Sequence, residues 1–390
     1  MHHHPEKSTA ENFVLRLKVF YAVLFVTLGV QMPFLPVWFA AKGLDPQDIG
    51  IVLAAAVVVR VFAIPLATGV ADRRGVRGVI IIAAAAATFA LAGLGLTAGM
   101  IAIMAAYSIA SAAYMPVMML ADTYALRGLA QRGLAYGPVR MWGSVAFIFA
   151  SFGAGALLNV MAAGDLIWLI VVTMSVATLA ATSLAPPDID TVNPAASPAQ
   201  KAPIWRDPSF VAVIAAASLI QASHAVYYGF STIDWQAAGF GGQTIGMLWA
   251  LGVIAEIAMF AASARLPAAL SPTALLLIGA AGALLRWGAM AVGPPAVALP
   301  VLQSLHGLSF GATHLGALGF VVRAAPPGEG ASAQGYLAVA LGLTMAGAMA
   351  ASGVLYDRYG GSAYGAMAVM ACIGGMSAFF AWRRTADPRQ

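Results

Sequence analysis

The sequence at 186–208 is Pro186-Pro-Asp-Ile-Asp-Thr-Val-Asn-Pro-Ala-Ala-Ser-Pro-Ala-Gln-Lys-Ala-Pro-Ile-Trp-Arg-Asp-Pro208, and it lies in the middle of a chain of 390 residues. Proline recurs throughout this stretch, so it cannot form a continuous apolar helix, and it predicts a solvated linker. The sequence on either side is strongly apolar. The stretch therefore divides the chain into two parts of similar length, 16–185 and 209–384.

The composition outside this linker indicates a membrane protein. Hydrophobic residues make up 61% of the chain and charged residues only 9%, whereas about a quarter of an ordinary soluble domain is charged. Crossing a hydrocarbon core of about 30 Å takes roughly 20 apolar helical residues. Windows of this kind fall at 16–41, 47–71, 78–98, 100–121, 134–158, 164–185, 209–238, 242–264, 272–293, 296–322, 330–356 and 361–382. The expected fold class is all-α and polytopic, with twelve transmembrane helices in two six-helix bundles.

The basic residues predict the orientation of these spans. If residues 1–15 and 385–390 are cytoplasmic tails, fifteen of the 20 Lys and Arg residues lie on the cytoplasmic side together with the linker 186–208. Only Lys42 and Arg358 then lie outside. This bias follows the positive-inside rule, so we expect a multi-pass protein of the bacterial inner membrane with both termini in the cytoplasm. The net charge of +5 comes from these loops and does not indicate a nucleic-acid partner.

Nine ionisable residues lie inside the spans or at their ends, where they are costly and are therefore the candidates for function. They are Arg60, Asp122, Arg140, His224, Asp234, Glu256, Arg286, His306 and His314.

Glu256 and Arg286 are expected at similar depth in spans eight and nine. A carboxylate at that depth is either ion-paired or protonated, and Arg286 is its natural partner. The guanidinium is also suited to hold a substrate carboxylate through two hydrogen bonds. Trp249 lies seven residues before Glu256, on the same helical face. A purely structural ion pair is the alternative.

Spans seven and ten carry aromatic and hydrogen-bonding side chains in helical stripes. His224 and Tyr228 share one face of span seven, Asp234 lies further along that span, and His306 lies on span ten. Such faces suit an aromatic or ring-shaped solute, and ordinary helix packing is the alternative. The histidines lack i,i+4 ligand spacing, so no metal site is expected.

Asp122 and Arg140 lie near the cytoplasmic ends of spans four and five, which a short loop makes antiparallel neighbours. We expect the two side chains to pair in at least one conformational state, as a gate, as part of the substrate site or as a static bridge.

The turn from Asp72 to Gly78 follows span two. Its sequence is Asp72-Arg73-Arg74-Gly75-Val-Arg-Gly78, and the glycines permit a tight turn. Asp72, Arg73 and Gly75 are predicted to form a latch that is made and broken during a conformational cycle. A static topology anchor is the alternative.

Residues 69–78 resemble the loop signature of the major facilitator superfamily, and the twelve spans with their central linker extend that resemblance over nearly the whole chain. A closer resemblance appears in Tyr136-Gly-Pro-Val-Arg140, in His224-Ala-Val-Tyr-Tyr228 and in Leu251-Gly-Val-Ile-Ala-Glu256. These segments look like the phenylpropionate permease group, which is related to the lactose permease type of proton symporter. The resemblance implies an aromatic monocarboxylate as substrate.

Lactose permease has a carboxylate on span four and an arginine eighteen residues later, as Asp122 and Arg140 are spaced here. It also has a carboxylate, an arginine and a histidine on spans eight, nine and ten, which Glu256, Arg286 and His306 match. The carboxylate one turn after that histidine handles the proton in lactose permease, and Ser309 stands in its place here. Glu256 is therefore the expected proton-coupling carboxylate, and Asp234 is the second candidate.

The sequence thus predicts a secondary active transporter that takes up a small organic solute with protons. An aromatic monocarboxylate is the first choice of solute, and a sugar or a nucleoside is the alternative. An intramembrane enzyme would need a nucleophile and base or a set of metal ligands, and no such constellation stands out, so we expect no enzymatic activity. The expected partners are the solute, protons and the lipid bilayer. The chain is expected to act as a monomer without a cofactor and to draw its energy from the proton gradient.

Overall fold

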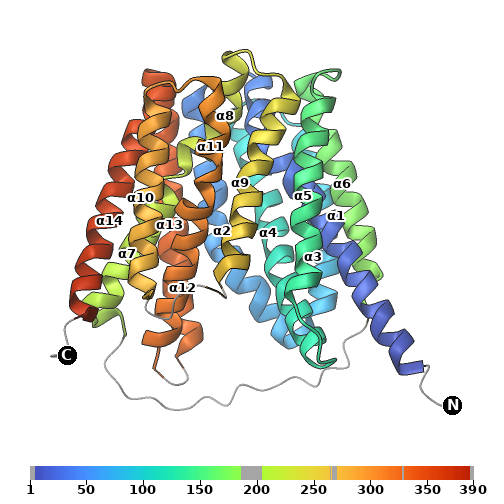
Figure 1. Cartoon of the computed structure of the whole chain (residues 1–390). Coiled ribbons are helices and arrows are strands. Elements are labelled where there is room, and N and C mark those ends of the chain that lie inside the picture. The colour runs from blue at the N-terminus through green and yellow to red at the C-terminus, as the bar shows by residue number, and fades with distance from the viewer. Residues whose placement is uncertain (1–4, 186–203, 264, 266–269, 327–328, 387–390) are drawn as a thin grey trace. The chain divides into compact units, whose positions relative to one another are not determined.

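The structure is a computed structural model that describes residues 5–185, 204–263, 265, 270–326 and 329–386. Most of the expected linker, 186–203, lies outside the described residues. Within them the chain forms helices and no strand, which agrees with the expected all-α class (Figure 1).

Six long helices form the first half of the chain. They are α1 (Pro5–Ala41), α2 (Pro46–Arg74), α3 (Val76–Gly95), α4 (Met100–Ala130), α5 (Gly137–Leu157) and α6 (Leu166–Thr182). The first helix begins at Pro5, so residues 5–15, which were predicted to be an N-terminal tail, are helical.

The second half contains eight α-helices because two of its spans are interrupted. They are α7 (Pro208–Ala222), α8 (Ala225–Ala237), α9 (Gly242–Ser263), α10 (Pro272–Ala291), α11 (Leu299–Ser304), α12 (Thr313–Ala324), α13 (Gly330–Tyr359) and α14 (Tyr364–Ala386). A π-helical turn, η4 (Gly307–Ala312), precedes α12.

Eleven apolar segments of the described chain are long enough to cross a membrane. One of them, Ser332–Thr385, has 54 residues and contains both α13 and α14. The chain reverses between these helices at Gly360, whose φ of 53° lies in the left-handed region that glycine adopts without strain. Counting α13 and α14 separately, the described residues provide the twelve crossings that the sequence predicts.

Spans seven and ten were predicted as continuous helices, and the structure interrupts both. Span seven breaks at Ser223 and His224, between α7 and α8. The Ser223 hydroxyl donates to the carbonyl of Ile220 at 2.6 Å, and His224 Nδ1 lies 3.0 Å from the carbonyl oxygen of Gln221. These side chains compete with the backbone for helical acceptors, which is how serine and similar residues weaken a helix interior.

Contacts between Cα atoms divide the chain into two units. The first contains Met1–Leu44, Ala55–Asn193 and Trp235–Ala250, and the second contains Asp45–Ala54, Pro194–Asp234 and Leu251–Gln390. Compared with the expected bundles 16–185 and 209–384, each unit gains a short segment from the other half of the sequence. In the first unit, the start of α9 packs closely against α5. The contact requires Gly155 of α5 and Gly242 of α9, since a methyl group on either would overlap the backbone of the other.

In the first unit, α1 packs against α5 and α6, and α3 packs against α4 and α6. Arg77 at the start of α3 donates to the carbonyls of Leu184 at 2.7 Å and Thr182 at 2.9 Å. It thereby caps the C-terminal end of α6, where the carbonyls lack helical partners and a positive charge is favourable.

In the second unit, α10 packs against α14 and α12, and α7 packs against α13 and α14 (Figure 1). Apolar side chains of these helices form one of its buried clusters, which includes Phe210, Leu276, Phe320 and Leu337. This packing holds α10 beside the interrupted span ten. Buried polar residues, including Arg286 of α10 and His306 of span ten, lie on these two elements.

Candidate functional site

The side chain of Arg286 lies on α10 and is completely buried. Its Nη1 donates to His306 Nδ1 at 2.8 Å, and its Nη2 donates to Gln303 Oε1 at 2.5 Å. A guanidinium can only donate, so Nδ1 of His306 must accept. Neutral His306 therefore carries its proton on Nε2.

Aromatic rings surround the guanidinium. Its central carbon lies 4.5 Å from the ring centroids of both Tyr227 and Trp287, a distance at which a cation is attracted to a ring face. Tyr364 stacks on Trp287 with 5.6 Å between centroids. The guanidinium is thus held by two hydrogen bonds and two ring faces.

Three buried polar atoms around Arg286 have no hydrogen-bond partner among the described residues. They are Arg286 Nε, Gln303 Nε2 and the hydroxyl of Tyr364. All three side chains are fully buried. Buried donors are nearly always satisfied in proteins because leaving one unpaired costs about 1–3 kcal/mol, so these unpaired donors make the side chains candidates for binding a ligand that accepts hydrogen bonds.

Glu256 meets this cluster through His306. The Nε2 atom of His306 lies 3.9 Å from Glu256 Oε2. The Glu256 side chain keeps 26% of its surface exposed, whereas His306 keeps 8% and Arg286 none. From the sequence, Glu256 was expected to pair directly with Arg286. In the structure, His306 contacts Arg286 with one ring nitrogen and faces Glu256 with the other.

His224 extends the cluster at the break in span seven. It is fully buried, its Nε2 lies 3.1 Å from Ser309 Oγ, and its ring is 5.6 Å from that of Tyr228 and 5.3 Å from that of His306. The structure therefore brings together four of the expected substrate-binding residues: His224, Tyr228, Arg286 and His306.

Two other expected residues are not among these contacts. Asp234 on α8 accepts a hydrogen bond from Tyr356 at 3.2 Å. Trp249 is buried in α9 and groups with the first unit.

The first unit brings Asp122 and Arg140 together. Arg140 Nε lies 3.5 Å from Asp122 Oδ1, and the same carboxylate oxygen accepts hydrogen bonds from Tyr21 at 2.7 Å and Tyr136 at 2.8 Å. The Arg140 guanidinium lies 4.0 Å from the ring centroid of Phe25. Both charged side chains are partly exposed, 28% for Arg140 and 39% for Asp122, so a solute can reach them.

The expected latch residues lie at the exposed turn between α2 and α3. Asp72 Oδ1 lies 3.9 Å from Arg127 Nη2, and both side chains are more than half exposed. Arg73 is exposed, and Gly75 has a φ of 91°. Arg127 was not expected from the sequence as the partner of Asp72.

Sequence reasoning also missed Gln303, Trp287 and Tyr364, whereas Tyr227 was expected beside Asp234 on a second stripe of span seven. Gln303 could have been noticed from the sequence, because its amide lies inside a predicted span, three residues before His306 and thus on the same helical face.

The comparisons with known proteins agree with the fold. The MFS_1 like family model matches residues 14–365. A protein of Escherichia coli (strain K12) named as a probable 3-phenylpropionic acid transporter is 33% identical over 363 residues, which cover 90% of this chain and 93% of that protein.

Solved structures share the fold at lower identity. The nucleoside transporter NupG is 20% identical with a TM-score of 0.81, and the match covers 96% of this chain and 100% of that one. A bacterial homolog of the human lysosomal transporter Spinster, in its inward-facing and occupied conformation, is 15% identical with a TM-score of 0.73 over 98% of both chains.

Proposed function

The chain belongs to the MFS_1 like family and is therefore a multi-pass membrane transporter rather than an enzyme, and we propose that it takes up a small aromatic monocarboxylate together with protons. From the distribution of basic loop residues we also propose that it lies in the bacterial inner membrane with both termini in the cytoplasm.

One observation carries the proposal for the substrate. Arg286 is a buried, permanent charge whose Nε has no partner among the described residues, and two aromatic rings lie against it. A substrate carboxylate would accept hydrogen bonds from Arg286 Nε and Gln303 Nε2. The ring of the same substrate would pack against Trp287 and Tyr364. A carboxylate joined to an aromatic ring meets both requirements, whereas a neutral solute leaves the guanidinium charge uncompensated.

The relative named as a probable 3-phenylpropionic acid transporter supports the same class of substrate. Because that protein matches almost the full length of this chain, we propose a phenylpropionate-like acid as the preferred solute of this chain as well.

Glu256 is proposed as the proton-coupling carboxylate, with Asp234 as the second candidate. Glu256 is the partly exposed acid beside the buried cluster, and the Nε2–H of His306 faces it. When Glu256 is protonated, the charge of Arg286 is available to the substrate anion. When Glu256 loses its proton, its negative charge competes with that anion, so proton and substrate each favour the binding of the other.

The variant Glu256→Gln tests this coupling because it fixes the side chain in a neutral form. Proteoliposomes containing the variant should exchange 3-phenylpropionate across the membrane at a rate close to wild type. They should lose the uphill accumulation that an inward proton gradient drives. Continued accumulation by the variant would place the proton site elsewhere, with Asp234→Asn as the next variant.

The same vesicles test the substrate class. Counterflow of labelled 3-phenylpropionate should be inhibited by other aromatic monocarboxylates, and not by 3-phenylpropanamide, lactose or uridine at the same concentration. Inhibition by the sugar or the nucleoside, without inhibition by the acids, would overturn the proposal of an aromatic acid.

A further inference from the structure

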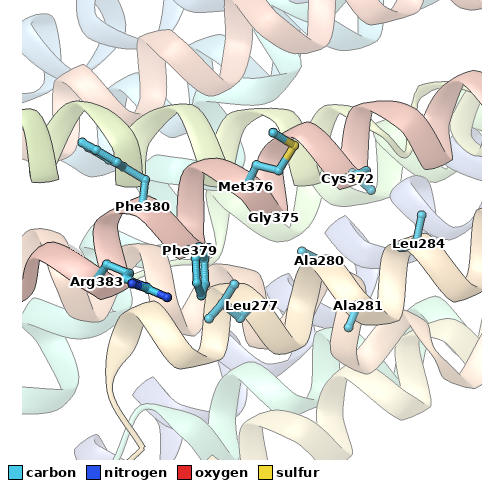
Figure 2. A pocket seen from close by; sticks show the side chains of 11 residues that line it. Leu277, Ala280, Ala281, Leu284, Cys372, Gly375, Met376, Phe379, Phe380 and Arg383 are labelled. Carbon is cyan, nitrogen blue, oxygen red and sulfur yellow. The ribbon is translucent and has the colours of Figure 1, made fainter. Parts of the chain in front are cut away.

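A groove of about 650 Å³ runs between α10 and α14 (Figure 2), and none of its lining residues belongs to the buried polar cluster around Arg286. Small residues create it, because Ala280 and Ala281 of α10 face Ala371 and Gly375 of α14 along its length. Its other lining residues are apolar except for Cys372 and Arg383. The volume is within the range of about 300–1,000 Å³ that is usual for sites that hold small molecules.

The groove opens on a face that meets the bilayer. Met376 and Phe380 line it and keep 67% and 50% of their surfaces exposed. Both helices lie in segments that are long and apolar enough to cross a membrane, so hydrocarbon chains of lipids are the molecules that this surface is expected to meet.

The length of the groove matches one leaflet. Figure 2 shows Arg383 at one end and Cys372 with Leu284 at the other. Residues 372–383 of a helix extend over about 16 Å, and half of the hydrocarbon core is about 15 Å. The groove therefore reaches from the membrane surface at Arg383 to about the middle of the bilayer, as one lipid chain does.

Two guanidinium groups mark the surface end. Arg383 lies 5.0 Å from the ring centroid of Phe379, and Arg384 lies 5.7 Å from that of Phe380. The Nε atom of Arg384 is buried and has no hydrogen-bond partner among the described residues. Arg383 lines the groove, and Arg384 follows it in the sequence. Guanidinium groups bind phosphate oxygens through paired hydrogen bonds, so Arg383 at the end of the groove is suited to a lipid phosphate, with a second guanidinium next to it in the chain.

We propose that this groove binds an anionic phospholipid, with one acyl chain along Ala281 and Gly375 and the phosphate at Arg383 and Arg384. In the proposed orientation this is the cytoplasmic leaflet, where basic side chains near the surface attract anionic lipids. The site is separate from the proposed substrate site, so the two proposals can fail independently.

Native mass spectrometry of the purified full-length protein tests the site with two lipids that share the same chains, palmitoyl-oleoyl phosphatidylglycerol and palmitoyl-oleoyl phosphatidylcholine. The wild type should bind phosphatidylglycerol more tightly, by about fivefold for each arginine that contacts the headgroup. The double variant Arg383→Gln/Arg384→Gln should lose this preference. The matched control Arg323→Gln, at the end of α12, should keep it.

A second variant tests the acyl-chain part. Ala281→Phe should weaken the binding of both lipids, and Ala86→Phe, at another exposed alanine on α3, should not. Cys372 is the one cysteine of the chain and lines the groove, so phosphatidylglycerol should also slow its alkylation by N-ethylmaleimide in unmodified protein.

Equal binding of the two lipids by the wild type would overturn the proposal. Lipid binding that neither set of variants changes would also overturn it, as would alkylation of Cys372 at the same rate with and without phosphatidylglycerol. A dimer that Ala281→Phe disrupts, with no lipid bound, would show instead that the groove is an interface between two copies of the chain.

Discussion

Replacing Arg286 with lysine separates the charge of this residue from its hydrogen-bonding geometry. Lysine keeps a positive charge at the position but has no Nε donor, and its ammonium is a point charge rather than a planar fork. In the structure, His306 and Gln303 each accept one of the five N–H donors of Arg286, and Nε is its nitrogen with no hydrogen-bond partner among the described residues. Arg286→Lys should therefore weaken carboxylate binding even though the charge is preserved.

The magnitude follows from the number of bonds lost. A hydrogen bond to a charged group contributes about 1.5–3 kcal/mol, which corresponds to about a 10- to 150-fold increase in Kd. A hydrogen bond between neutral groups contributes about 0.5–1.5 kcal/mol. If the neutral analogue 3-phenylpropanamide binds, Arg286→Lys should therefore weaken its binding much less than it weakens the binding of 3-phenylpropionate.

Equilibrium binding of labelled 3-phenylpropionate to purified protein measures this effect, and the thermal unfolding temperature of each variant serves as the control for folding. Lysine leaves acceptors of the buried cluster unpaired, so a loss of stability is expected as well. If Arg286→Lys does not fold, Gln303→Met removes the free donor Gln303 Nε2 with an apolar side chain of similar size, and it also removes the acceptor of Arg286 Nη2. Acid binding within about threefold of wild type in each of these variants that folds, a difference of less than one hydrogen bond to a charged group, would refute the proposed carboxylate site.

Three further predictions concern the first unit. Asp72→Asn should slow transport strongly while the amount of protein in the membrane stays normal, because the exposed pair with Arg127 contributes little to stability; normal transport rates would contradict a latch. Exchanging Asp122 and Arg140 should restore part of the thermal stability lost in each single variant, and wild-type stability and uptake in both single variants would show that the pair has no role. Gly155→Ala should lower the unfolding temperature, since its methyl group would overlap the backbone of α9 and overpacking costs about 1–3 kcal/mol. Gly153→Ala, on the same helix with open space around it, is the control, and equal unfolding temperatures would contradict the close contact.

The number of spans could be predicted because the membrane imposes a length. An apolar run of about 20 residues between polar turns has few other interpretations, and the twelve predicted windows correspond to twelve crossings in the described chain. The reversal at Gly360 was predicted for the same reason. The length rule carries no information about irregular backbone inside a span, so the interruptions at His224 and at Gly307–Ala312 were not predicted.

The candidate site was found from the sequence only where a residue is costly in lipid. Arg286, Glu256 and His306 stand out because an ionisable group inside a span requires a reason. Gln303 and Trp287 cost less, and so they did not stand out. The depth of a residue in the membrane can be read from the sequence, but its rotation about the helix relative to neighbouring helices cannot. For this reason the sequence predicted a direct pair of Glu256 and Arg286, whereas in the structure His306 lies between them and faces both.

The two interruptions that the sequence did not predict both lie at the proposed substrate site. His224 stands at the break between α7 and α8, and His306 immediately precedes the π-helical turn η4. Irregular backbone at membrane depth is tolerated where protein buries it or where it lines a cavity, and transporters form their binding sites at discontinuous helices. The backbone of spans seven and ten therefore points to the same location as the unpaired donors of Arg286 and Gln303, and it does so without reference to charge.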